Sequence, residues 1–276
     1  MREQLKQEAR FIAKGLRCSA APTGRGHESR PVRDVHVAWA ERSETRVSLS
    51  INPSYSCHPL SSLDSKPMLV YHFINERFGL EALRNRRLKI ARIMELNDPF
   101  EFLAVDLSDR GFRKVIKTTK ATLSKTNGIL CFSKTWTHPI LWGHYADKHK
   151  GICLGFEVPR QFLKKVDYVE CRFEKPNVLN EAFMKKLLFT KFKHWEYEQE
   201  YRTYLQLEDE IDGLYFSDFS ADLSLKRVIV GDQSKITRSQ IYQSLGSLQN
   251  NVEMFKARAG FRSFEVVRNK NEAMWT

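Results

Sequence analysis

Apolar and polar positions follow regular periods only in the part of the chain after Met68. Alternating or continuously apolar runs predict strands at 69–73, 88–93, 128–132, 151–158, 166–173, 204–207, 227–230 and 264–267, with another near Phe255. Apolar residues at helical spacing predict helices at 79–87, 108–124, 139–148, 180–192 and 238–248. Because strands and helices mix without a regular β-α-β alternation, the pattern predicts an α+β fold with a mixed β-sheet, either continuous or split, flanked by helices.

The first 67 residues carry no comparable pattern. After a short amphipathic start at 3–16 they are rich in Arg, Ser, Pro and Ala, and they repeat at neither the helical nor the strand period. We therefore predict a disordered or extraneous leader over 1–67 and a single α+β domain over 68–276. A basic tail that contacts a partner is the alternative for the leader. Translation that begins at Met68, directly before the first predicted strand, would also account for it.

The charge balance is basic. The chain has 45 Lys and Arg residues against 33 Asp and Glu residues, a formal net charge of +12. The leader holds 11 basic and 7 acidic residues, which leaves 34 against 26, or +8, for the domain. Such a balance favours contact with an anionic partner such as nucleic acid or a nucleotide phosphate. The charges are interleaved with apolar positions, so solvated helix faces are the simpler interpretation.

Cysteine usage and apolar runs indicate the compartment. None of the five cysteines forms a CxxC pair or stands at zinc-ligand spacing, and Cys131 and Cys153 lie inside apolar runs, as buried free thiols do. No run of about 18 apolar residues could span a bilayer, and the N-terminus lacks a signal-peptide pattern. We expect a cytoplasmic protein with no membrane partner and no metal cofactor.

Two polar or aromatic clusters stand at predicted element ends, where functional residues concentrate. The turn at 97–101 would expose Asn97 and Asp98 to a ligand, or would only bond its own backbone. Helical spacing puts Trp142 and Tyr145 on one face, as part of the core or as the wall of a cleft for a planar ligand.

A third cluster combines two acids and a base. On one extended strand, Glu198, Glu200 and Arg202 would project to the same face. Two neighbouring carboxylates can divide catalytic roles between them, whereas a ladder of exposed charges would contribute little. No GxGxxG, P-loop, HExxH or GxSxG signature accompanies these clusters.

Five ordered segments resemble the bacterial domain of unknown function 2971 family. They are LVYHF at 69–73, NDPFE at 97–101, CFS at 131–133, LWGHYADKHKGICLGF at 141–156 and WEYEQEYR at 195–202. The resemblance covers residues 68–267 and does not extend into the leader. It implies membership of that family and carries no activity with it.

A broader resemblance is to the ADP-ribosyltransferase superfamily. Those enzymes carry a polar or aromatic residue on the first strand, a second motif at a strand end that leads into a helix, and a glutamate on a later strand. The matching positions here are Tyr71 or His72, Ser133 with Tyr145, and Glu200. The sequence departs from the pattern because no Ser-Thr-Ser stands at the second motif, which leaves the NAD site open.

The second resemblance implies an NAD-using transferase or NAD glycohydrolase of bacterial toxin or phage-defence type, with NAD as substrate and an unidentified protein or nucleic-acid acceptor. It implies that Glu200 stabilises the oxocarbenium-like ribose, that Glu198 orients the acceptor, and that Tyr145 or Trp142 stacks on nicotinamide. His72 and Ser133 would hold ribose hydroxyls. The residues expected to bind NAD are Tyr71, His72, Ser133, Trp142, Arg202, Asn97 and Asp98. We expect Glu200→Gln to abolish turnover with the thermal midpoint nearly unchanged.

Two other function classes stay open at this point. A metal-dependent nucleic-acid-acting enzyme could gather four carboxylates around Mg²⁺, namely Asp98, Glu101, Glu198 and Glu200. A non-enzymatic module could use the +8 charge of the domain to bind nucleic acid or nucleotides.

Overall fold

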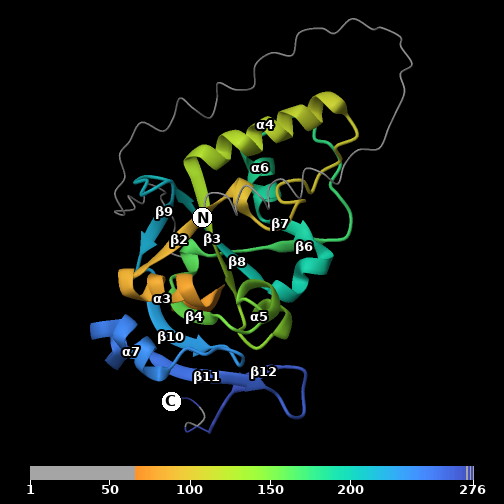
Figure 1. The fold of residues 1–276 in the computed structure, drawn as a ribbon. Helices are drawn as coiled ribbons and strands as arrows, with labels where there is room; N and C mark the ends of the chain where they lie inside the picture. Colours follow the sequence, from red (N-terminus) through yellow and green to blue (C-terminus); the bar gives the residue numbers. More distant parts are fainter. Residues whose placement is uncertain (1–65, 272, 274, 276) are drawn as a thin grey trace, which may run out of the picture. The chain divides into compact units, whose positions relative to one another are not determined.

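The computed structural model describes residues 66–271, 273 and 275. The predictions for the leader thus fall almost wholly outside the described residues. The strands are β1 (Met68–Ile74), β2 (Arg87–Arg92), β3 (Asn127–Ser133), β4 (Ile152–Val158), β5 (Lys164–Lys165), β6 (Asp167–Val169), β7 (Thr190–Phe192), β8 (Glu200–Gln206), β9 (Tyr215–Asp218), β10 (Ser224–Val230), β11 (Glu253–Ala259) and β12 (Val266–Arg268). The predicted α+β class is confirmed (Figure 1).

The helices pack along this sheet. They are α3 (Glu76–Asn85), α4 (Arg110–Thr126), α5 (Pro139–Tyr145), α6 (Glu181–Leu188) and α7 (Arg238–Leu245), with 3₁₀ turns η1 (Ile93–Glu95), η2 (Arg160–Phe162), η3 (Lys193–Glu198) and η4 (Gly246–Asn251). No helix within the described residues is long and apolar enough to cross a membrane.

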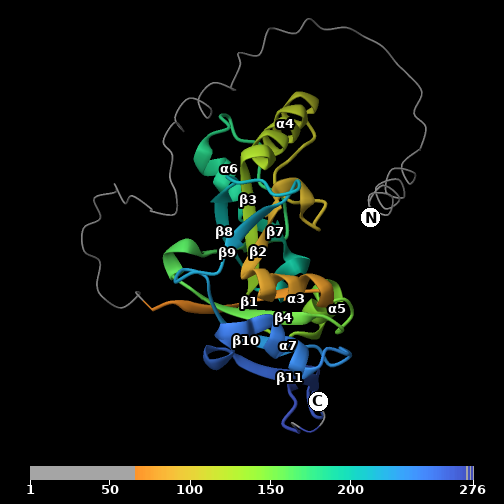
Figure 2. The ribbon, with the colours of Figure 1, turned by 60° about the vertical axis from the view of Figure 1, so that its left-hand side comes forward.

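The main sheet is mixed and divides into two parts. Its strand order is β12-β11-β10-β4-β1-β3-β2-β9, and β8 pairs with the other edge of β3. Strands β1 and β4 pair along their whole length, whereas β1 and β3 share a single paired position, Tyr71 with Ser133. The β3–β8 part consequently runs at a steep angle to the β1–β4–β10 part (Figure 2). The sheet is therefore split between β1 and β3.

Three clusters of buried side chains hold the split sheet. One joins β1, β4 and β10 to α3 and α7 and also includes residues of β2 and β3, and another lies between β3, α4 and α6. A third surrounds Trp142, whose side chain is wholly buried beside Tyr71 and Phe255. Burying each large apolar side chain stabilises the fold by roughly 1.5–3 kcal/mol. Both parts of the sheet are thus stabilised by burial of large apolar side chains.

Several predicted boundaries were wrong in ways that affect the site. The predicted helix at 139–148 ends at Tyr145, because Asp147, Lys148 and His149 take positive φ angles of 44°, 55° and 68°. The strand predicted at 166–173 shortens to β6, and the helix predicted at 180–192 divides into α6 and β7. Strand β7 matters most, because it carries a lysine into the site.

Candidate functional site

A pocket occupies the split in the sheet. One edge of β3 pairs with β8 from Asn127 to Ser133. The other edge meets β2 only at Ile129 and Gly128, and β1 only at Ser133. The cavity beside this open edge has a volume of about 200 Å³. It is lined by β1, the end of β2, the turn after η1, β3, α5, β7 and the residues around the start of β8.

The side chain of His72 binds one backbone carbonyl group on the open edge of β3. Its Nδ1 lies 2.9 Å from the carbonyl oxygen of Cys131. A carbonyl can only accept, so Nδ1 carries the proton and donates, and Nε2 keeps its lone pair. Burial lowers the pKa of His72 below its usual value, which favours the neutral ring. Nε2 has no hydrogen-bond partner among the described residues, so it is available as an acceptor in the pocket.

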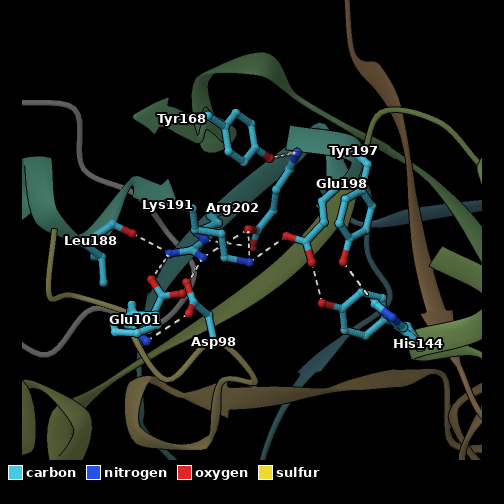
Figure 3. A network of polar contacts seen from close by, with 12 residues as sticks. Asp98, Glu101, His144, Tyr168, Leu188, Lys191, Tyr197, Glu198 and Arg202 are labelled. Carbon is cyan, nitrogen blue, oxygen red and sulfur yellow. Dashed lines mark hydrogen bonds and ion pairs between the residues drawn. The ribbon is translucent and has the colours of Figure 1, made fainter. Parts of the chain in front are cut away.

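A buried ion network borders the pocket (Figure 3). Its members Lys191, Glu198 and Glu200 line the pocket, and Glu101 and Arg202 lie outside the lining. The Arg202 guanidinium donates to both oxygens of Glu101, at 2.6 and 2.9 Å, and to both oxygens of Glu200, at 2.8 and 3.1 Å. Burial alone would raise the pKa of Glu200, but the charges of Arg202 and Lys191 outweigh it and lower the pKa to about 2. Glu200 is therefore ionised and fixed from several sides.

Lys191 joins the two glutamates at the pocket. Its Nζ lies 2.6 Å from Oε2 of Glu198 and 2.8 Å from Oε2 of Glu200. Burial lowers the pKa of Lys191, but the two carboxylates reverse the direction and raise it, so the ammonium stays charged. The side chain is almost wholly buried, so this charge acts at short range and without screening by water.

Glu198 has a different environment from Glu200. Its Oε1 accepts a very short hydrogen bond from the hydroxyl of Tyr145. Burial raises its pKa, an effect that the neighbouring charge of Glu200 reinforces and Lys191 opposes. Burial and the charge of Glu198 also raise the pKa of Tyr145, so its hydroxyl remains a donor. The two carboxylates thus differ in proton affinity although they share Lys191.

Backbone geometry places both glutamates at the pocket. The prediction that Glu198 and Glu200 share one strand was wrong, because β8 begins at Glu200 and Glu198 ends η3. Gln199 between them takes a left-handed conformation, with φ of 44°, and the amide of Glu200 donates to the hydroxyl of Tyr168 at 2.8 Å. In the sheet, Glu200 pairs with Ser133, which in turn pairs with Tyr71. The three residues form one cross-strand row.

The structure brings most of the predicted site residues together. Seven of them line the pocket: Tyr71, His72, Asn97, Ser133, Tyr145, Glu198 and Glu200. Tyr71 does so with its hydroxyl turned away, since that oxygen accepts a hydrogen bond of 2.9 Å from Arg227.

Three predicted residues lie outside the pocket lining. Trp142 is in the core, where its Nε1 donates to the carbonyl oxygen of Trp136 at 2.6 Å. Arg202 lies behind Glu200, and Asp98 is buried with Oδ1 accepting from the amide of Phe100 at 2.9 Å. The contact of Asp98 corresponds to the alternative given for the 97–101 turn, in which a side chain of the turn bonds the backbone of the same turn.

Sequence reasoning missed two members of the site. Lys191 sits in the segment predicted as the end of a helix, and no motif marks it. Glu101 was considered only as a metal ligand, yet it binds Arg202. Across residues 66–271, no group of three His, Cys, Asp or Glu side chains is arranged to hold a metal ion.

Comparisons with protein-family models, curated proteins and solved structures find no match to this chain. The inference of a function therefore rests on the pocket and its side chains.

Proposed function

We propose that the pocket is the active site of an NAD-consuming enzyme, which transfers ADP-ribose from NAD to an acceptor or to water in the bacterial cytoplasm. One observation supports this best. Four side chains from three distant parts of the sequence, His72, Tyr145, Glu198 and Glu200, line one cavity in a split sheet. Their order along the chain resembles that of the ADP-ribosyltransferase superfamily.

The size of the cavity suits one end of the substrate. Small-molecule sites usually measure roughly 300–1,000 Å³, and this one measures about 200 Å³. It would hold the nicotinamide and its ribose, while the rest of the dinucleotide extends outside. Leu96, Ile129 and Leu141 supply apolar walls, and the ring of Tyr145 offers a face for nicotinamide.

The charges in the wall fit a cationic transition state. Three carboxylates face two cations in the buried ion network, so the set carries one net negative charge when all are ionised. As the bond from ribose C1′ to the nicotinamide nitrogen breaks, its electron pair moves to that nitrogen and positive charge develops on the ribose. A fixed negative group in a site shielded from water stabilises such charge.

The proposal gives Glu200 a different role from the one that the resemblance implied and keeps Glu198 as the residue that acts on the acceptor. Both oxygens of Glu200 are already occupied by Arg202, and one of them also by Lys191. Glu198 has fewer donors and a raised pKa, which suits a group that meets the substrate and takes up a proton. An acceptor or water oxygen then bonds to C1′ and releases its proton to Glu198, from which it passes to solvent. Glu200 positions Lys191 and thereby Glu198.

His72 adds a contact on the other side of the pocket. Its Nε2 can accept a hydrogen bond from a ribose hydroxyl, because Nδ1 is committed to Cys131. Ser133 and Asn97 lie on the same lining and offer further polar groups. These residues would orient the sugar while Glu198 acts on it.

The experiment is nicotinamide release from NAD by the full chain, with Glu198→Gln beside it. We expect the variant to lose activity by about 10²-fold or more, as general acid–base catalysis commonly contributes. Glu196→Gln is the matched control, because Glu196 lies two positions away, is exposed and pairs with Lys193. The proposal fails if Glu198→Gln keeps the wild-type rate. It fails equally if the wild type releases no nicotinamide with water, protein or nucleic-acid acceptors.

A further inference from the structure

The loop between β11 and β12 exposes two aromatic rings. Phe261 is 88% exposed and Phe264 is 100% exposed, the highest values among the large apolar side chains of the described residues. The loop is closed at its base, where the amide of Gly260 donates to the carbonyl oxygen of Glu265 at 2.8 Å. These strands end the sheet on the side opposite β9 (Figure 1). Exposed apolar groups of this size mark a contact surface rather than a core.

Basic side chains alternate with the two rings. From Glu253 to Asn271 the segment holds five basic residues against two acidic ones: Lys256, Arg258, Arg262, Arg268 and Lys270 against Glu253 and Glu265. The guanidinium carbon of Arg258 lies 3.9 Å from the ring centroid of Phe261. Arg258 also donates to the carbonyl oxygen of Ala259 at 2.8 Å, which holds the guanidinium over the ring. One face of Phe261 is therefore covered by a cation while the ring as a whole remains exposed.

We propose that this aromatic tip, residues 258–264, binds single-stranded nucleic acid. Unpaired bases stack on exposed aromatic side chains, and neighbouring arginines add cation–π and phosphate contacts. The rings of Phe261 and Phe264 provide the stacking surfaces, and Arg258 and Arg262 provide positive charge beside them. The inference goes beyond the proposed NAD activity and does not depend on it.

The same features fit an anionic membrane less well. Inserting Phe261 into lipid would carry the stacked Arg258 guanidinium toward the hydrocarbon, where a charge is costly. Stacking with a base leaves that guanidinium at the surface, beside the phosphates. The geometry therefore favours a nucleic-acid strand over a lipid surface.

The test measures the affinity of the full chain for a short fluorescein-labelled oligothymidylate by fluorescence anisotropy. We expect the double substitution Phe261→Ala and Phe264→Ala to weaken binding by about 10-fold or more, with the slope of affinity against salt unchanged. Arg258→Gln with Arg262→Gln should instead reduce that slope, because phosphate contacts are lost. Phe78→Ala is the control, since Phe78 is also exposed and lies under a guanidinium, that of Arg77.

Two results would overturn the proposal. If the double phenylalanine variant binds as tightly as the wild type, the oligothymidylate contacts basic side chains of the protein without stacking on Phe261 and Phe264. If the wild type binds vesicles of phosphatidylglycerol and phosphatidylcholine but does not bind the oligothymidylate, the aromatic tip is a membrane contact. Neither result bears on nicotinamide release, so this proposal and the NAD proposal can fail independently.

Discussion

Arg202 holds both carboxylate oxygens of Glu101, at 2.6 and 2.9 Å, although 101 positions separate the two residues. Neither side chain is more than 1% exposed. Glu101 belongs to the turn that follows η1, and Arg202 belongs to β8, so this pair fastens the turn beside the pocket to the sheet. Its loss would affect both the stability of the domain and the shape of the site.

Glu101→Gln should lower the free energy of unfolding by about 3 kcal/mol or more, because it leaves part of a buried guanidinium without its counter-charge. Denaturation in urea measures the change. Glu181→Gln is the control, since Glu181 pairs with Lys185 at 2.7 Å on an exposed helix face and should change stability by less than about 1 kcal/mol. Equal effects of the two substitutions would contradict the role given to the Glu101–Arg202 pair.

Glu200 should make stability depend on acid pH. Its pKa falls from the usual 4.5 to about 2 on folding, so the ionised form stabilises the native state above pH 4.5. That stabilisation, on the order of 3 kcal/mol, should be lost as pH falls from 4.5 toward 2. In Glu200→Gln the free energy of unfolding should decline much less over this pH interval. Unfolding measured at a series of pH values tests this. An unchanged decline would assign the acid sensitivity to other groups.

The same variant revises an expectation from the sequence. Glu200→Gln was expected to leave the thermal midpoint nearly unchanged, as for a purely catalytic residue. Because Glu200 binds both Arg202 and Lys191 in the core, we now expect a lower midpoint. A change in activity of this variant alone therefore does not identify Glu200 as catalytic. Because Glu198 is also buried and binds Lys191, the activity of Glu198→Gln must likewise be compared with its thermal midpoint.

Residue patterns along the chain predicted the fold class because each strand and helix has its own local period. The periods of β1, β3 and β4 are regular, and their predicted bounds differ by at most one residue at either end from the observed ones. Strand β7, with three residues, is too short to show a period, and it was absorbed into the preceding helix. Lys191 was missed for that reason.

The site was partly predictable from residue types. Candidate residues His72, Ser133, Tyr145 and Glu198 stand in ordered motifs, and all of them line the pocket. The roles within the site depend on long-range pairing that no local pattern contains. The hydrogen bonds from Arg202 to Glu101 and from Tyr145 to Glu198 form only when β8 meets the turn after η1, and the end of η3 meets α5, in space.

His72 should produce a second, separate pH dependence. Burial lowers its pKa in the folded protein, so the unfolded chain takes up this proton more readily as pH falls below about 6.5. Stability should therefore decrease from pH 6.5 downward, until the folded-state pKa is reached. The thermal midpoint measured between pH 8 and pH 5 should fall less steeply in His72→Gln, which cannot take up that proton. A slope equal to that of the wild type would show that His72 is not held neutral against Cys131.

Two glycines near α5 should respond in opposite directions to alanine. A Cβ on Gly151 would lie 2.2 Å from the carbonyl oxygen of Ile74, a backbone group that cannot move without displacing β1. Gly151→Ala should thus destabilise the domain by about 1–3 kcal/mol or more.

Gly143 provides the contrast within the same segment. A Cβ there meets no atom within 4 Å, and the residue lies inside α5, so Gly143→Ala should stabilise the domain by up to about 1 kcal/mol. Urea denaturation of both variants measures the signs, and the same sign for both would contradict the packing described. The turn between α5 and Gly151 begins directly after Tyr145, and the amide of Gly151 donates to the carbonyl oxygen of Ala146. Gly151→Ala should therefore also shift Tyr145 and reduce nicotinamide release more than Gly143→Ala does.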